Sequence, residues 1–409
     1  MCAKWNDKNF NPGIITSELN KVRKQSAGKV EYKGWAFQPL RAALTSAIIF
    51  DFRIHESVRP RLINRALFAI TPQGKLSTDD IVNEICDQER RYLSIPPKPY
   101  FLRSNLSISG PLPFNQYTFD RKKMAFKFSR SKFDQKGVPR YAVDHFHGPV
   151  PENYQPVLID VRARSDTEAG NIALDYLDFV RGQWNLWLNS AVSLKLTAGK
   201  RQPVNQVRLG PLHTLHNQNG DLVEENFWWY EPNYIDPGKS ADLSQNSNSL
   251  KKFSINCRRM LAGSGLKECA IEGLIRYTRA LDHWNLETCY IELWSTLEYL
   301  TNSDRNANEP TIRRAASLYG NYQLALEIAK HLRERRNRLI HSAEQNEDVE
   351  ILIYQLKNYV EHLLRFYISN QFKLNSRNEV SQFLDQPHDV GVLRRRMKLT
   401  QDALTYRGQ

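Results

Sequence analysis

Residues 336–341, Arg336-Asn337-Arg338-Leu339-Ile340-His341, lie between two long segments with the periodicity of helices. In 311–335 and in 346–368, apolar residues recur at steps of three to four positions. They are Leu318, Tyr322, Ala325, Ala329 and Leu332 before the stretch, and Leu352, Leu356, Tyr359, Leu363 and Tyr367 after it. Such spacing is typical of helices that bury one face. The pattern predicts two consecutive helices with the hexapeptide at their junction.

The hexapeptide pairs an Arg with a His five residues later. An Arg and a His that converge on one phosphodiester can supply a phosphate clamp and a proton-transfer group. The spacing alone is common, because it also occurs at Arg140/His145, Arg140/His147, Arg208/His213 and Arg276/His283. The pair at 336 and 341 differs in having Asn337 directly after the Arg and two aliphatic residues before the His. The alternative is a helix C-terminus whose arginines lie near the last carbonyls.

A third amphipathic helix is predicted upstream, over residues 285–302. Leu293, Leu297 and Leu300 mark its apolar stripe, and Glu298 lies one residue off that stripe. A Glu beside an apolar stripe is an ordinary feature of a surface helix, so its position alone leaves open whether Glu298 serves the Arg–His pair.

Together these segments resemble the HEPN ribonuclease superfamily, in particular its Apea-like branch. The resemblance is carried by the Arg-Asn-x-x-x-His pattern at 336–341, the run Trp-Ser-Thr-Leu-Glu-Tyr-Leu at 294–300 and the run Arg-Arg-Ala-Ala-Ser-Leu-Tyr-Gly at 313–320. It covers about residues 265–370. It implies an all-helical bundle and metal-independent endonucleolytic cleavage of RNA to 2′,3′-cyclic phosphate ends. It also implies a toxin or antiphage defence effector.

The resemblance assigns a role to each residue of the motif. His341 exchanges the proton of the attacking 2′-hydroxyl or of the leaving 5′-oxygen, and Arg336 holds the non-bridging phosphate oxygens. Asn337 orients its neighbours, and Glu298 positions Arg336 or His341. We expect the charges of Arg333, Arg335 and Arg338 to guide the RNA backbone. In the family, two copies usually pair with their motifs facing each other, so the resemblance implies a homodimer.

The composition indicates a globular protein of two or three domains, with 409 residues, 41% apolar and 25% charged. Its net charge of +13 favours an acidic partner, and nucleic acid is the commonest one. The alternative is a generally basic surface. No apolar run approaches the ~20 residues that cross a bilayer, and Met1–Lys8 lacks an apolar signal core. We therefore expect a cytoplasmic protein whose five scattered cysteines are reduced thiols.

The pattern along the chain predicts an α+β fold with five segments. Residues 1–35 are expected to form a loose basic arm, and 36–235 a mixed α/β domain of unknown role. Within that domain, 77–93 is predicted to be a helix capped by Ser77 or Thr78, and Ser165–Glu168 a capping box that opens a helix to about residue 189. A polar linker follows at 236–263, then the HEPN-type helical domain at 264–370 and a basic tail at 371–409.

A basic stretch at 121–140 is a second candidate for contact with RNA. Lys122, Lys123, Lys127 and Arg130 belong to it, and Phe126, Phe128 and Phe133 interleave with its cations. The stretch fits an RNA-stacking platform, and it fits equally a half-buried strand with a solvated face.

Neither a metal nor a cofactor is expected. His145/His147 and His213/His216 have the spacing of metal ligands, but neither pair has the further ligands that a closed zinc site needs.

Two functions from different classes follow. The first is a HEPN-type endoribonuclease, and its rival is a non-catalytic RNA-binding or assembly module of a defence complex. We expect the dimer to form through 346–368, because Tyr354, Tyr359, Phe366 and Tyr367 spread around more than one face of that helix.

Overall fold

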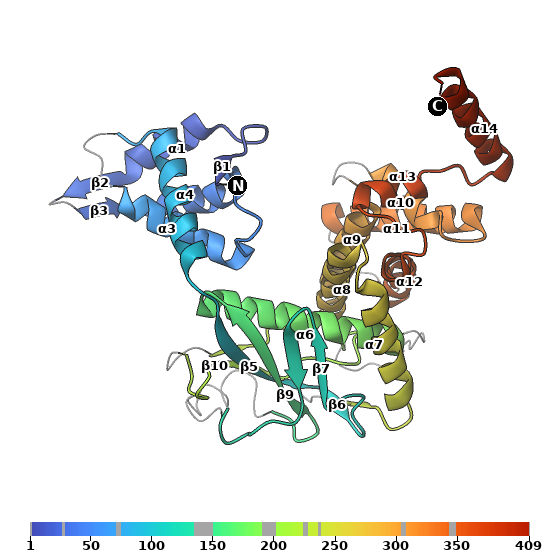
Figure 1. The fold of residues 1–409 in the computed structure, drawn as a ribbon, viewed down its shortest axis with the longest axis horizontal. Helices are drawn as coiled ribbons and strands as arrows, with labels where there is room; N and C mark the ends of the chain where they lie inside the picture. Colours follow the sequence, from blue (N-terminus) through green and yellow to red (C-terminus); the bar gives the residue numbers. More distant parts are fainter. Residues whose placement is uncertain are drawn as a thin grey trace. The chain divides into compact units, whose positions relative to one another are not determined.

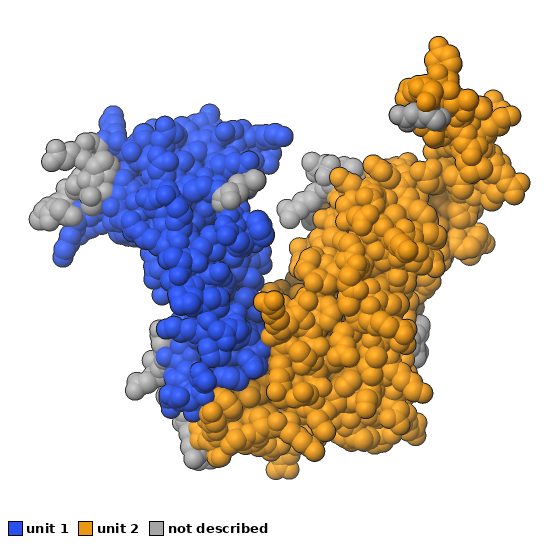
Figure 2. All heavy atoms as spheres, in the orientation of Figure 1, with its two compact units in different colours: residues 1–102, 160–174, 215–223 blue, residues 103–159, 175–214, 224–409 orange. Residues whose placement is uncertain are grey.

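The computed structural model describes residues 2–26, 29–70, 75–134, 150–189, 202–223, 228–235, 239–303, 308–342 and 349–408. The chain divides into two compact units (Figure 2). Unit 1 comprises Met1–Leu102, Asp160–Leu174 and Leu215–Val223, and unit 2 comprises Arg103–Ile159, Asp175–Thr214 and Glu224–Gln409. The division differs from the predicted domains, because parts of the expected 36–235 domain belong to the same unit as the C-terminal helices.

Unit 1 begins with short strands and helices of the N-terminal hundred residues (Figure 1). They are β1 (Lys4–Trp5), α1 (Pro12–Val22), β2 (Arg23–Ser26), β3 (Lys29–Tyr32), α2 (Phe37–Ala47), β4 (Ile48–Ile49), the 3-10 helix η1 (Glu56–Val58), α3 (Arg59–Ala69) and α4 (Thr78–Ser94). β1 pairs with β4 and β2 with β3, both antiparallel. Helix α4 confirms the capping prediction, since Asp80 N donates to Ser77 Oγ and Ser77 N to Asp80 Oδ2.

Residues 1–35 are not the loose arm that their polarity predicts. Helix α1 begins after Asn11, whose side chain accepts a hydrogen bond from Ile14 N. Ile15 and Leu19, four residues apart and therefore on one face of this helix, are buried in the core of unit 1. The core is built from residues of α1 to α4, and it includes Leu44, Leu62, Ile63, Leu67, Ile81 and Ile85.

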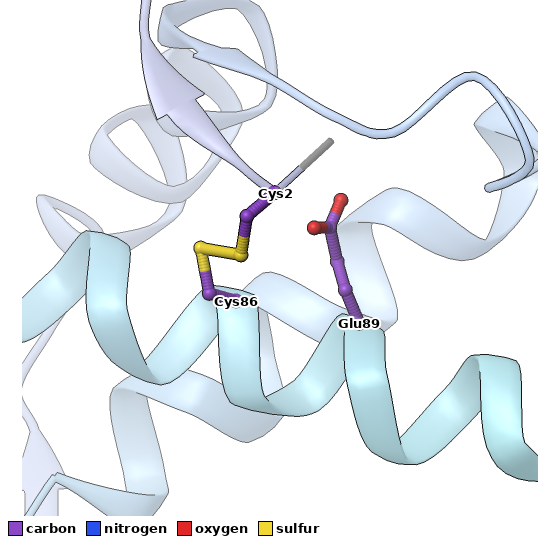
Figure 3. Close-up of side chains that lie close together, drawn as sticks. All are labelled: Cys2, Cys86 and Glu89. Atoms are coloured by element: carbon purple, nitrogen blue, oxygen red, sulfur yellow. A yellow bond between two sulfur atoms is a disulfide. The ribbon is translucent and has the colours of Figure 1, made fainter.

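A disulfide between Cys2 and Cys86 ties the N-terminal segment to α4 (Figure 3). One turn further along α4, Glu89 accepts hydrogen bonds from Ala3 N at 2.8 Å and from Asp51 N at 2.9 Å. The expectation of reduced thiols is therefore wrong for this pair. Their spacing along the chain gave no sign of pairing, since 84 residues separate them and only the packing of unit 1 brings them together.

The largest sheet has six strands in the order β11-β10-β5-β9-β8-β7. Its strands are β5 (Lys98–Leu106), β7 (Gln116–Phe119), β8 (Lys122–Ala125), β9 (Gln155–Ala163), β10 (Leu212–His216) and β11 (Trp228–Tyr230), and β6 (Ile108–Ser109) pairs separately with β12 (Ala241–Asp242). Ser165 caps helix α6 (Asp166–Leu188) as predicted, because Glu168 N donates to Ser165 Oγ, but the carboxylate of Glu168 accepts from Arg164 N and not from the N–H of Ser165. Its C-terminal half packs on the β7–β8 end of the sheet, where Trp184 stacks with Phe126.

The remaining helices of unit 2 are α7 (Ser247–Leu261), α8 (Lys267–Asp282), α9 (Leu286–Thr301), α10 (Asn308–Ala316), α11 (Tyr322–Ser342), α12 (Val349–Ser369), α13 (Arg377–Leu384) and α14 (Val390–Tyr406). α9 packs against both α8 and α12, whereas α10 packs mainly against α11. The structure thus confirms an α+β fold with a C-terminal helical region. None of the described helices is long and apolar enough to cross a membrane.

The segment 236–263 is not the polar linker that its composition predicts, because α7 lies within it. Leu250, Cys257 and Leu261 of α7 are buried, and Ser254 accepts a hydrogen bond from Trp184 Nε1 at 3.1 Å. The segment 371–409 is not an irregular tail either, since it contains α13 and α14. Helix α14 has no buried residue, so its basic residues Arg394–Arg396 are exposed as expected.

Candidate active site

The motif 336–341 lies inside a helix, in the last turns of α11, and not in the connection between two helices. The predicted helix 311–335 is in fact two helices, α10 and α11, which are separated by a turn at residues 317–321. Gly320 and Asn321 in that turn lie between Leu318 and Tyr322, so the apolar repeat continues across the break and gave no sign of it. The connection after the motif, residues 343–348, lies outside the described residues, and so does the side chain of His341.

Arg336 and Asn337 are both half-buried, and they contact each other through their side chains. Arg336 Nη1 donates a hydrogen bond to Asn337 Oδ1 at 3.4 Å. No carboxylate of the described residues forms an ion pair with Arg336. The guanidinium group therefore keeps most of its donors, and its full charge, available to an anion.

The helical backbone relates Arg336 and His341 through Asn337. Residues 336 and 341 are five apart, which is about 140° around a helix axis, so the two residues do not share a face. Residues 337 and 341 are four apart, and they lie on one face a turn apart. An Asn that contacts Arg336 and shares a face with His341 is well placed to orient both halves of the motif.

The neighbouring arginines of α11 fall into three environments. Arg333 pairs with Glu309 of α10 at 3.2 Å and with Glu334 at 3.1 Å. Arg335 is only 3% exposed, so it differs from the expected RNA contact and belongs to the interior. Arg338 is exposed. Of these three arginines, Arg333 and Arg338 therefore remain at the surface of α11.

Helix α9 supports α11 one turn before the motif. The hydroxyl of Tyr290 donates a hydrogen bond to the carbonyl oxygen of Leu332 at 2.7 Å, and both residues are buried. Burial raises the pKa of the Tyr290 hydroxyl well above its usual value, so this donor keeps its proton at neutral pH. The contact fixes the position of the C-terminal part of α11 along α9.

Glu298 does not contact the motif among the described residues. It is 8% exposed, and its carboxylate accepts a hydrogen bond from Trp294 Nε1 at 2.8 Å, within the same helix. Glu298 lies about 12 Å of helical rise from Tyr290, the residue that joins α9 to α11. The sequence places Glu298 on the correct helix, but its carboxylate is directed at an indole and not at Arg336.

In the described part of the basic stretch, residues 121–134, two of the three aromatic rings are not exposed for stacking on bases. Phe126 and Phe133 are buried, and the ring of Phe126 stacks on Trp184 of α6. Strand β8 ends at Ala125, and the rest of the described stretch forms bends and turns. Lys127 and Arg130 are exposed and Lys122 and Lys123 partly so, hence these cations remain accessible without aromatic partners.

The histidine pairs do not form a metal site in the part of the chain that is described. His145 and His147 lie outside it. His213 is buried, with Nδ1 2.9 Å from Ser104 Oγ and Nε2 3.5 Å from Glu231 Oε2, while His216 Nδ1 contacts the carbonyl oxygen of Gly220. The two imidazoles are thus held by separate partners.

Within the described residues, Cys2, Cys86 and Glu89 form the one cluster close enough to share a metal ion. Their atoms are already engaged, as Figure 3 shows for the two sulfurs. Each carboxylate oxygen of Glu89 accepts a backbone hydrogen bond. A metal would have to displace a covalent bond and both of these contacts, so the cluster is structural.

A buried charge network in unit 2 was not foreseen from the sequence. Arg181 of α6 is fully buried, and it donates to both carboxylate oxygens of Asp282 at 3.1 and 2.8 Å and to Asp178. Burial lowers the pKa of Arg181, but the charges of Asp282 and Asp178 outweigh that effect and the net shift is upward. The i, i+3 spacing of Asp178 and Arg181 was the available signal.

Comparison of the chain with known proteins finds no match among family models, curated proteins or solved structures.

Proposed function

We propose that the protein is a metal-independent endoribonuclease of the HEPN type, with Arg336, Asn337 and His341 as its catalytic residues. The observation that carries the proposal is the state of Arg336, which is half-exposed near the end of α11 and bonded only to a neutral amide among the described side chains. An arginine without a carboxylate partner is suited to bind a phosphate.

In this mechanism the 2′-hydroxyl of RNA attacks the adjacent phosphorus, and the bond to the 5′-oxygen breaks. His341 accepts the proton of the nucleophile or returns a proton to the leaving oxygen. Arg336 donates to the non-bridging oxygens and stabilises the charge that develops on them. The products are a 2′,3′-cyclic phosphate and a 5′-hydroxyl, and no external reagent is consumed. Asn337 orients Arg336, while Arg333 and Arg338 attract the backbone.

The same proposal describes a cytoplasmic toxin or antiphage effector that acts on RNA, with a defence-system protein as a possible partner. Glu298 enters it as a positioning residue, whose carboxylate holds the indole of Trp294 one turn earlier on α9.

Replacement of His341 by Ala tests the proposal. We expect cleavage of RNA to fall by about 10²–10⁴-fold, since general acid–base catalysis contributes that much. His331→Ala is the matched control, because His331 is an exposed residue of the same helix, and it should cut at the original rate. Sequencing of RNA for new cyclic-phosphate ends gives the readout. Equal activity of the two variants would remove His341 from the mechanism, and activity that requires added metal would replace the mechanism altogether.

The rival function is a non-catalytic RNA-binding or assembly module. It is favoured by one observation, namely that Glu298 is bonded to Trp294 and not to the motif. The experiment above separates the two functions, because the rival predicts that the unmodified protein binds RNA and produces no cyclic-phosphate ends.

We propose further that the active form is a two-fold homodimer, which would double the positive charge around one phosphate. Tyr359 and Tyr367 of α12 are buried within the chain, and Phe366 packs against Phe372 and Phe383. Three of the four aromatic residues expected to join two copies therefore pack within the chain, and Tyr354 is half-buried. Exposed Ile351 of α12 and Leu324 of α11 are the apolar residues left for such a contact. Light scattering at low micromolar concentration tests the dimer. A monomeric protein whose cleavage rate rises in proportion to its concentration would exclude it.

A further inference from the structure

The hairpin of β2 and β3 lies at the edge of unit 1 (Figure 1), and its two faces differ in burial. Its register pairs Arg23 with Tyr32, Lys24 with Glu31, Gln25 with Val30 and Ser26 with Lys29. Because side chains alternate along a strand, Val30 and Tyr32 share the inner face. Val30 is buried, and Tyr32 stacks on Phe37 with the ring centroids 4.5 Å apart.

The outer face of the hairpin is basic. It carries Lys24, Lys29 and Glu31, and the next pair adds Lys33, whose N–H donates to the carbonyl oxygen of Val22 at 2.9 Å. All four side chains are exposed. Three cations against one carboxylate give this small surface a net charge of +2.

Two of these lysines lie close together despite their like charge. Lys24 and Lys33 are diagonal neighbours across the hairpin, on the same side of the pleat. The ammonium group of Lys33 beside it lowers the pKa of Lys24. No carboxylate of the described residues forms an ion pair with either lysine. Glu31 lies opposite Lys24 on the same face but forms no ion pair with either lysine, so the three cations of this face outweigh its charge and favour the binding of a phosphate group.

Trp35 follows the lysines by two residues and is 90% exposed. It lies in the turn between β3 and α2, where Gly34 adopts a φ of +76° that favours glycine. Phe37 N donates to the carbonyl oxygen of Gly34, and Phe37 packs on Tyr32 and Phe68 beneath the turn. The contacts of Phe37 thus fix one side of the turn to the protein, while the indole of Trp35 is exposed to solvent.

We propose that this surface, the outer face of the β2–β3 hairpin with Trp35, binds single-stranded nucleic acid. Lys24 and Lys33 contact a phosphate, and Trp35 stacks on an unpaired base next to it. Cations that follow a backbone and an aromatic face for the bases are the two components of single-strand binding sites. An anionic membrane fits less well, because the outer face offers a single apolar side chain to insert. The site is distinct from residues 336–341, and it stands whether or not those residues cleave RNA.

Fluorescence anisotropy with the full chain tests the site. The ligand is a labelled 2′-O-methyl oligouridine of about 12 nucleotides, which cannot be cleaved through a 2′-hydroxyl, and oligo-dT of equal length tests for RNA preference. Trp35→Ala should weaken binding by about tenfold or more, since one stacked base is lost. Trp284→Ala is the control, because Trp284 is 50% exposed in unit 2 and should leave the affinity unchanged.

The lysines are tested by the salt dependence of the same binding. Lys24→Ala with Lys33→Ala should reduce the slope of log affinity against log salt by about 0.7, the value for one phosphate contact of a single strand. Lys251→Ala with Lys252→Ala, an exposed pair on α7, should not change it. Unchanged affinity in the Trp35 variant, or an unchanged slope in the Lys24/Lys33 variant, overturns the proposal. If the Trp35 and Lys24/Lys33 variants lose binding to anionic vesicles but keep binding to the oligonucleotides, the surface binds membranes instead. Failure of cleavage in the His341 experiment leaves these results unaffected.

Discussion

Two helical arginines of unit 2, Arg181 of α6 and Arg336 of α11, show how the environment separates a structural cation from one that is available to a ligand. Arg181 is fully buried, and Asp178 and Asp282 neutralise it. Arg336 is half-exposed and contacts the amide of Asn337. Both lie on long helices, and nothing in the sequence next to either residue shows how many carboxylates surround its guanidinium group. The number of carboxylates around each guanidinium group makes the difference.

The largest expected effect is on stability, from removal of the buried cation. Arg181→Met should lower the free energy of unfolding by about 3–5 kcal/mol, because Asp282 is left buried without its charge partner. Urea denaturation followed by circular dichroism measures the change. Adding Asp282→Asn removes the unpaired charge and should recover part of the loss. A single variant within about 1 kcal/mol of the original protein would contradict the structural role.

The next effect concerns activity and not stability. Arg336→Lys keeps the charge but loses the planar pair of donors, so we expect cleavage to fall by about 10²-fold or more. The free energy of unfolding should change by no more than about 0.5 kcal/mol, as for other accessible positions. Initial rates on a labelled RNA, together with urea denaturation, give both values. A variant that loses stability and activity together would place Arg336 in the same class as Arg181.

The smallest effect is expected at Arg333, whose two ion pairs are partly exposed to solvent. Arg333→Gln should alter the free energy of unfolding by less than about 1 kcal/mol. If Arg333 contacts the RNA backbone, the salt dependence of binding should weaken by about 0.7 in slope. Binding of non-cleavable RNA over a range of salt concentrations checks this value. An unchanged slope would leave Arg338 as the guiding cation of α11.

The elements that the sequence predicted well are those set by local interactions. The caps at Ser77 and Ser165 each need residues only three positions apart; Ser77 forms the full capping box, and Ser165 forms the serine half of one. The helices from 267 to 369 follow from apolar repeats of three to four residues, which depend on the geometry of one helix. The motif at 336–341 was likewise visible as a short pattern, although its location inside α11 was not.

Only the tertiary structure decided which side each of these elements turns inward. Arg335 and Arg336 are adjacent in the sequence, yet one is buried and the other is half-exposed, because successive residues of a helix point about 100° apart. Glu298 contacts Trp294, and Cys2 reaches Cys86 across 84 residues. Helix α7 has a polar composition, but its few apolar residues bury a single face. The sequence by itself determined where helices begin and which residues carry charge. The long-range packing determined which of those charges remain free to bind a partner, since burial and ion pairing depend on residues far away along the chain.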